Sequence, residues 1–247
     1  MVWDDLASNW KGFRPPLCPH ADDVTALARA IAGHDSSVLL LGVTPQLAGL
    51  GQRLTAVDHS AEMIARVWPG DSASRMAVKG EWLADMPSDH AFTAVVSDGG
   101  LSCLRWPDEY ERLFKVLKAT CEPGFRLALR CHLADNFGGA VPLDRLAREI
   151  AEVPDPDPHA ARHRVAHALV LEGADPNIGV AEMADRALLL VSHSPAASAV
   201  LKAWPRPPAD VRFSFPTRQR VESLLSRNGF TVAPAPALPG LVIADAD

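Results

Sequence analysis

The 247-residue sequence lacks two features that would assign it to large classes of protein. It has no block of Lys or Arg, and its formal net charge is −6, so it has no basic surface for a nucleic-acid backbone. Its longest apolar run, Ala187 to Val191, is far too short to span a bilayer. We therefore expect a soluble protein that binds neither nucleic acid nor a membrane.

Cysteines are also few, and the motifs of several common catalytic centres are missing. The four cysteines, Cys18, Cys103, Cys121 and Cys131, show no CxxC spacing, and the N-terminus has no basic, apolar leader. This predicts buried thiols and a cytoplasmic protein. No His-Glu-x-x-His, Gly-x-Ser-x-Gly or Walker lysine motif occurs, so the sequence gives no reason to expect a metal ion.

What the sequence does contain is a regular alternation of short apolar runs and amphipathic stretches. The predicted strands are 38–41, 54–58, 75–79, 91–98, 125–131 and 241–243. The predicted helices are 21–33, a segment capped by Ser60, 107–120 and a segment capped by Thr217, with a turn at 121–124. This alternation is typical of βαβ units and predicts an α/β fold with a doubly wound, mainly parallel sheet.

Residues 133–213 break this regularity, because helical patterns there are separated by Pro-rich stretches at 154–158 and 205–208. We interpret 133–213 as a helical insertion after the fifth strand. It would cover the side of a single domain, 1–247, at which a substrate binds. Within this insertion His163 and His167 have i, i+4 spacing, and a solvated helix face is the favoured interpretation over a metal site.

The N-terminal residues 1–35 are interpreted as a lid and the first helix of the domain. The aromatic residues Trp3, Trp10 and Phe13 fit a lid over a bound substrate, and they fit a tail packed on the sheet equally well.

The most informative segment is the first predicted strand, which ends at Gly42, together with the second, which ends at Asp58. Such a pair builds a nucleoside site, because the backbone approaches the ligand at the glycine and the carboxylate accepts from two ribose hydroxyls. The alternative is that Asp58 only stabilises the turn after its strand.

Together these segments resemble the class I S-adenosylmethionine-dependent methyltransferases, over roughly 36–132 and more loosely over 214–245. The resemblance implies a Rossmann-like, seven-stranded sheet and S-adenosyl-L-methionine as the cofactor, bound along the carboxyl ends of the first strands. The first motif of that family is an acid followed by Gly-x-Gly-x-Gly. Here Gly42 is kept, while the other positions of that motif hold Leu40, Thr44 and Gln46.

The resemblance assigns the cofactor contacts to residues that follow the first four strands. Asp58 would bind the ribose, Glu81 the adenine amino group, and Asp98 the ammonium of the methionine moiety. The complete set is Gly42, Val43, Thr44, Asp58, His59, Met63, Glu81, Trp82, Asp98, Gly99 and Leu101. Asp85 is a weaker candidate for the adenine acid, and a surface position is an alternative for Trp82. A loop-shaping role is an alternative for Asp98 and Gly99.

The implied reaction is methyl transfer, an in-line displacement that depends mainly on positioning, so that a general base is optional. His132, at the end of the fifth strand, is the candidate base for a hydroxyl acceptor, with a structural His as the alternative. Arg130, Asp135 and Asn136 could orient a polar acceptor. The insertion suggests a covered pocket and a small-molecule acceptor, and it leaves a homodimer open as well.

Two other functions remain open. A nicotinamide-dependent oxidoreductase shares the order of strand, glycine turn, helix, strand and acid, but the sequence lacks Gly-x-Gly-x-x-Gly. A non-catalytic or altered-cofactor member of the same fold is the other alternative, and Leu40, Thr44 and Gln46 are the residues that favour it.

Overall fold

The structure is a computed structural model that describes residues 2–84, 86–87, 92–136, 142–152, 158–173, 175–190, 192, 194–202, 211–234, 238 and 240–247. The chain forms two compact units. The sheet unit comprises Met1–Leu101, Pro107–Cys131 and Gln219–Asp247, and the helical unit comprises Ser102–Trp106 and His132–Arg218. Each unit is described separately below.

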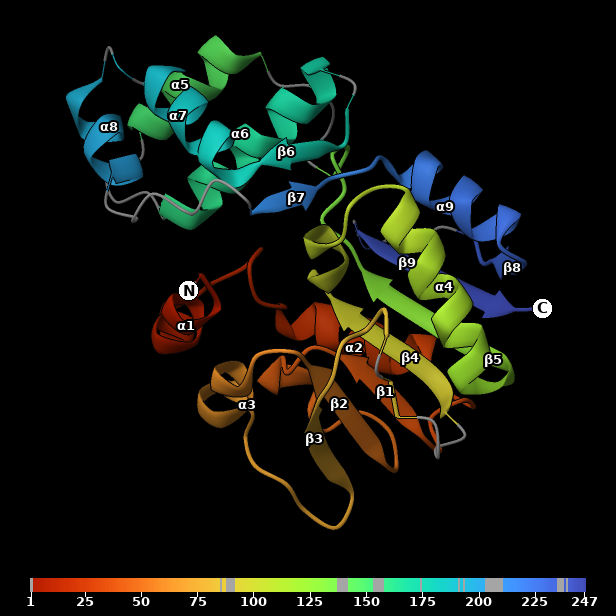
Figure 1. Cartoon of the computed structure of the whole chain (residues 1–247). Coiled ribbons are helices and arrows are strands. Elements are labelled where there is room, and N and C mark those ends of the chain that lie inside the picture. Colours follow the sequence, from red (N-terminus) through yellow and green to blue (C-terminus); the bar gives the residue numbers. More distant parts are fainter. Residues whose placement is uncertain are drawn as a thin grey trace. The chain divides into compact units, whose positions relative to one another are not determined.

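The sheet unit is built on a seven-stranded sheet with the strand order β3-β2-β1-β4-β5-β9-β8 (Figure 1). The strands are β1 (Val38–Leu41), β2 (Leu54–Asp58), β3 (Arg75–Lys79), β4 (Phe92–Asp98), β5 (Cys121–Arg130), β8 (Phe230–Val232) and β9 (Leu241–Ala246). Only β9 runs antiparallel to its neighbours. The predicted seven-stranded, mainly parallel sheet is therefore confirmed, and its order reverses between β1 and β4.

Helices cover both faces of this sheet. They are α1 (Val2–Asn9), η1 (Trp10–Gly12), α2 (Ala21–Ala30), η2 (Pro45–Leu47), α3 (Ala61–Val67), η3 (Gly100–Cys103), α4 (Asp108–Thr120) and α9 (Arg218–Arg227). On one face Leu27 of α2 and Met63 of α3 pack in a core cluster with Leu40 of β1. On the other face α4 and α9 lie side by side (Figure 1), and Phe114 of α4 meets Phe230 edge to face at 5.5 Å. Both faces of β1 are therefore buried, as its unbroken apolar run predicts.

Local hydrogen bonds explain where the helices of the sheet unit begin and end. The Ser60 hydroxyl accepts from Met63 N at 3.2 Å, which confirms the predicted cap of α3. His20 and Asp23 form a reciprocal capping box at the start of α2. Gly229, with φ of 72°, provides the left-handed residue that ends α9 before β8.

One local prediction was wrong. Cys121–Gly124 is not a turn but the first part of β5, because Cys121 pairs with Phe92 and a register shift between Phe92 and Ala94 takes up the irregularity. The connection between β1 and β2 contains no α-helix. Residues 42–53, all of them described, contain only the 3₁₀ turn η2. The parallel crossover is made by a loop of minimal length.

The helical unit has its own core. Its elements are α5 (Leu143–Glu152), α6 (Pro158–Gly173), α7 (Val180–Leu190), α8 (Pro195–Lys202) and an antiparallel pair of short strands, β6 (Asn177–Gly179) and β7 (Arg212–Ser214). Leu146, Ile150, Val165, Met183 and Phe215 are buried together in this core. The helices agree with the predicted patterns, whereas the three-residue strands are too short to give a periodic signal.

His163 and His167 are buried rather than on a solvated face, with exposed fractions of 8% and 2%. Their rings pack against each other and against Phe215, with centroids 4.5 to 5.1 Å apart. Burial lowers the pKa of His167 well below its usual value, and the neighbouring His163 lowers it further. The prediction of a solvated face was wrong because the residues beside both histidines in α6, among them Val165, Ala166 and Leu169, are buried as well.

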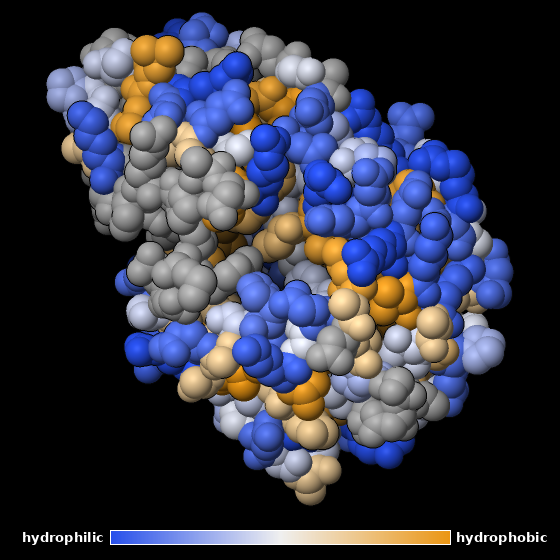
Figure 2. Space-filling view, in the orientation of Figure 1, coloured by the Kyte–Doolittle hydropathy of each residue, from blue (hydrophilic) through white to orange (hydrophobic). Residues whose placement is uncertain are grey.

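The surfaces carry few large apolar side chains. Among the described residues Met76 and Leu189 are exposed large hydrophobics, and the face shown in Figure 2 is mostly hydrophilic. No helix in the described part of the chain has the length and apolar character needed to cross a membrane. Of the cysteines expected to be buried, Cys18 and Cys131 are buried, whereas Cys103 and Cys121 are partly exposed.

The tight β1–β2 connection generates a stability prediction. A Cβ at Gly51 would collide with the Val38 side chain and lie 2.8 Å from Asp35 O, and φ there is +72°. We expect Gly51→Ala to lower the free energy of unfolding by about 2–4 kcal/mol, through crowding and left-handed strain together. Urea denaturation measures this change.

Gly70→Ala is the matched control, since Gly70 has φ of +97° but a Cβ added there would meet no atom within 4 Å. It isolates the backbone strain, which is about 1–2 kcal/mol. Equal losses in the two variants would show that the β1–β2 loop is not crowded.

Candidate functional site

The turn after β1 is held by bonds to both neighbouring strands. Gly42 has φ of 97°, and its N–H donates to Val57 O of β2 at 2.9 Å. Val43 and Thr44 are buried, and the Thr44 hydroxyl donates to Asp98 Oδ2 of β4 at 3.3 Å. The hydroxyl that stands in place of a motif glycine is therefore directed to the end of β4.

Asp58 ends β2 with its carboxylate largely buried. Its Oδ1 accepts from Ser60 N at 2.8 Å and lies 3.7 Å from His59 Nδ1. Burial raises the pKa of Asp58, and the negative charge of Glu81 raises it further, while the Ser60 hydrogen bond and His59 oppose the shift. The hydrogen bond from Ser60 N and the contact with His59 Nδ1 both involve Oδ1 of Asp58.

Glu81 and Trp82 follow β3 at the same edge of the sheet. Glu81 is exposed, and its influence on the Asp58 pKa shows that the two acids lie near each other. Trp82 Nε1 donates to Val57 O at 2.8 Å, so Trp82 is anchored to β2 and is not a freely exposed surface residue. Asp85 lies outside the described residues.

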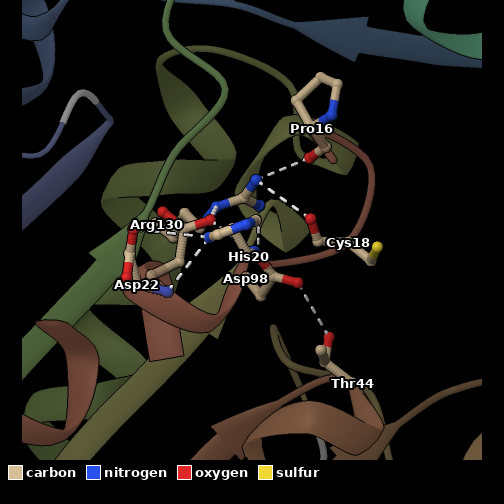
Figure 3. Close-up of polar contacts among 8 residues, drawn as sticks. Pro16, Cys18, His20, Asp22, Thr44, Asp98 and Arg130 are labelled. Carbon is tan, nitrogen blue, oxygen red and sulfur yellow. Dashed lines mark hydrogen bonds and ion pairs between the residues drawn. The ribbon is translucent and has the colours of Figure 1, made fainter. Parts of the chain in front are cut away.

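Asp98 is neutralised by a partner that was predicted for a different role. The Asp98 side chain is 1% exposed and forms an ion pair with Arg130 of β5. Arg130 also donates through Nε to Asp23 at 3.1 Å and through a terminal nitrogen to Pro16 O at 2.8 Å (Figure 3). Burial raises the pKa of Asp98, and Arg130 and Thr44 oppose that shift.

This network accounts for both oxygens of Asp98. Oδ1 accepts from Arg130 and Oδ2 from Thr44. A cofactor ammonium at the predicted position would meet an Asp98 that already pairs with Arg130, and the Arg130 guanidinium is directed to Asp98, Asp23 and Pro16 O. Sequence patterns gave no signal for the partnership with Asp23, because pairing across such a distance depends on the fold.

The segment after β4 passes close to the other strand ends. Gly99 has φ of 67°, and its N–H donates to Arg130 O at 2.8 Å. Leu101 is buried. Sequence reasoning gave no role to one residue here, Ser97, the last but one residue of β4. A hydroxyl near the end of an apolar strand was the available signal.

The proposed base His132 belongs to the helical unit. Its ring is half-buried and meets His163 edge to face, with centroids 4.4 Å apart. Asp135 accepts from Arg218 N at 3.1 Å and so helps to start α9. Among the described residues, no group of three or more His, Cys, Asp or Glu side chains is arranged to hold a metal ion.

Known structures share this fold at low sequence identity. The CcbJ methyltransferase from Streptomyces caelestis matches with a TM-score of 0.59 and 14% identity, over 97% of this chain and 94% of that one. The 1,6-didemethyltoxoflavin-N1-methyltransferase of Burkholderia thailandensis, bound to 1,6-didemethyltoxoflavin and S-adenosylhomocysteine, has a TM-score of 0.51 and 15% identity, over 100% and 88%.

A Rhodobacter sphaeroides structure provisionally named as a Zn-dependent alcohol dehydrogenase also matches, with a TM-score of 0.53 and 15% identity over 97% and 96%. No protein-family model and no curated protein matches the sequence. The comparisons therefore establish a Rossmann-like α/β fold. This is also the fold of the two methyltransferases described above, which agrees with the resemblance seen in the sequence.

The Arg130–Asp98 pair generates a prediction about stability. Asp98→Asn leaves a buried guanidinium without its closest counter-charge, and we expect a loss of about 3 kcal/mol in the free energy of unfolding. Chemical denaturation of the purified variant measures it.

Asp245→Asn is the control, because Asp245 pairs with Arg126 at a site where the two side chains are 38% and 25% exposed. Its loss should stay below about 1 kcal/mol. A loss as small for Asp98→Asn would contradict a central role for the buried pair.

Proposed function

We propose that this protein is an S-adenosylmethionine-dependent methyltransferase that acts on a small-molecule acceptor. One observation carries the proposal: a buried carboxylate, Asp58, ends β2 beside Glu81, on a sheet with the strand order of the matching fold. A carboxylate in this position can accept from two neighbouring ribose hydroxyls, which is the recognition that an adenosyl ligand needs.

The residues around Asp58 have distinct proposed tasks. Gly42 lets the backbone of the first turn approach the ligand, and Glu81 accepts from the adenine amino group. His59 follows Asp58 directly and Met63 lies in the first turn of α3, and both would border the adenine. The cofactor supplies an electrophilic methyl group on a sulfonium, and the protein contributes positioning and exclusion of water. For a hydroxyl acceptor, His132 would accept the proton.

The same geometry argues against a dinucleotide enzyme. A pyrophosphate is bound at the N-terminus of an α-helix that directly follows the first strand, where backbone N–H groups converge. Here Gly42 is followed by η2, a single 3₁₀ turn, and no α-helix occurs between β1 and β2. The likeness to the dehydrogenase-named structure is therefore a likeness of fold.

An altered-cofactor protein is the second candidate, and specific contacts favour it. Leu40 is fully buried where the family motif has an acid, and the Thr44 hydroxyl and Arg130 occupy both oxygens of Asp98. The methionine end of the ligand would then be bound less tightly than the adenosine end. Comparing adenosine with S-adenosylhomocysteine measures the contribution of the methionine end.

Isothermal titration with S-adenosylhomocysteine and NADH tests the proposed function. We expect the first to bind, and we expect Asp58→Ala to weaken binding by about 1–3 kcal/mol because charge-assisted hydrogen bonds to the ribose are lost. Glu62→Gln, which removes the same charge on nearby α3, should leave the affinity unchanged.

The outcomes separate the candidates. Binding of NADH alone would refute the methyltransferase proposal. Binding of neither ligand would favour the altered-cofactor candidate. An Asp58→Ala variant with the affinity of the wild type would place the ribose elsewhere.

The raised pKa of Asp58 also predicts a pH dependence. The ribose hydroxyls bind better to the ionised carboxylate, so affinity for S-adenosylhomocysteine should fall as the pH is lowered through this pKa. Because the pKa is raised, the fall should begin at a higher pH than an ordinary Asp would give. Titration calorimetry at several pH values measures it, and the pH dependence should be much reduced in Asp58→Asn. An equally steep decline in that variant would assign it to another group.

A further inference from the structure

The indole of Trp82 lies between the two glycines of the candidate site. A Cβ added to Gly42 would be 3.9 Å from the ring, and one added to Gly100 would be 2.7 Å from Cη2 and 3.3 Å from Cζ3. Gly42 follows β1 and Gly100 lies just beyond β4. The ring therefore extends from its own position after β3 across the carboxyl ends of β2, β1 and β4.

A second, independent observation comes from Ser97. This side chain is fully buried, and its Oγ has no hydrogen-bond partner among the described residues. The same added Cβ on Gly100 would be 3.1 Å from Ser97 Oγ, so the hydroxyl and the indole border a single point. A buried hydroxyl that bonds to nothing is unfavourable and calls for an explanation.

The anchor of the ring is a single hydrogen bond. Trp82 Nε1 donates to Val57 O, which already accepts from Gly42 N. The side chain is half-buried, so rotation toward solvent breaks one hydrogen bond and the contacts with two glycines. Neither glycine has a side chain that would hold the ring in place.

We propose that Trp82 is a gate that closes the adenosyl site of the free protein. This inference rests on the proposed function. In the closed state the indole covers the floor between Gly42 and Gly100 and leaves the Ser97 hydroxyl without a partner. In the open state the ring has moved away, the adenosyl ligand occupies its place, and a polar group of the ligand bonds to Ser97.

The gate has a thermodynamic consequence. A ligand that binds only the open state has its apparent affinity reduced by the fraction of protein that is open. Removing the indole should therefore tighten binding, whereas removing a side chain that forms a wall of the site would weaken it. The two roles of Trp82 thus predict changes of opposite sign.

The test is calorimetric titration of S-adenosylhomocysteine into the full chain and its variants. We expect Trp82→Ala to bind about fivefold more tightly than the wild type, which corresponds to the free energy of the one hydrogen bond that opening breaks. The affinity of Trp82→Phe should lie between those of the wild type and Trp82→Ala, because this variant keeps a ring but lacks the N–H. Ser97→Ala should bind about fivefold more weakly, with an unchanged or raised melting temperature, since the free protein loses only an unpaired hydroxyl.

Trp68→Phe is the matched control. Trp68 Nε1 donates to Asp71 Oδ1 at 2.8 Å, so this variant loses the same kind of bond, but its indole is buried in the core cluster with α3. Its affinity for the ligand should equal that of the wild type. Melting temperatures measured for every variant separate loss of folding from loss of binding.

Each result decides between the alternatives. Tighter binding by Trp82→Ala and Trp82→Phe than by the wild type supports the gate. Equal or weaker binding by both overturns the gate and leaves the proposed function intact. If no variant binds S-adenosylhomocysteine, the proposed function fails, and the gate fails with it. Unchanged binding by Ser97→Ala overturns the contact between the ligand and Ser97.

Discussion

The buried ion pair of Arg130 and Asp98 is the interaction on which the candidate site depends. It joins the ends of β4 and β5, and it extends through Thr44 to the turn after β1 and through Asp23 to α2. A charge so deeply buried is tolerated only with a partner, so these elements are constrained together. The pair therefore constrains the carboxyl edge of the sheet, where the residues of the candidate site lie.

The sequence was sufficient for the parts of the fold that repeat a pattern. The apolar runs of β1 and β2, the cap at Ser60 and the left-handed Gly229 follow from local chemistry, and each lies where that chemistry predicts. The path of the β1–β2 connection could not be predicted in the same way, because it depends on contacts with residues outside the loop. Its crowding at Gly51 appears only when the loop is folded against Val38.

The candidate site also contains residues whose positions follow from the sequence and residues whose contacts do not. The position of Asp58 follows from the end of a strand, whereas the states of Asp98 and Trp82 depend on residues far away in the chain. A pattern cannot show that Arg130 neutralises Asp98, since the ion pair spans two strands and its second acid lies on α2. The burial of His163 and His167 was missed for a related reason, because His132 and Phe215, whose rings pack against them, lie outside α6.

The imidazole cluster of the helical unit makes that unit sensitive to acid. Burial lowers the pKa of His167 in the folded state, so the unfolded chain takes up this proton first as the pH falls through 6.5, the ordinary value for His. The stability that neutral His167 contributes is present above that pH and is lost below it. Mild acidification thus acts on the core of the helical unit, where the His163 ring contacts both His132 and His167, and would loosen this packing by proton uptake alone.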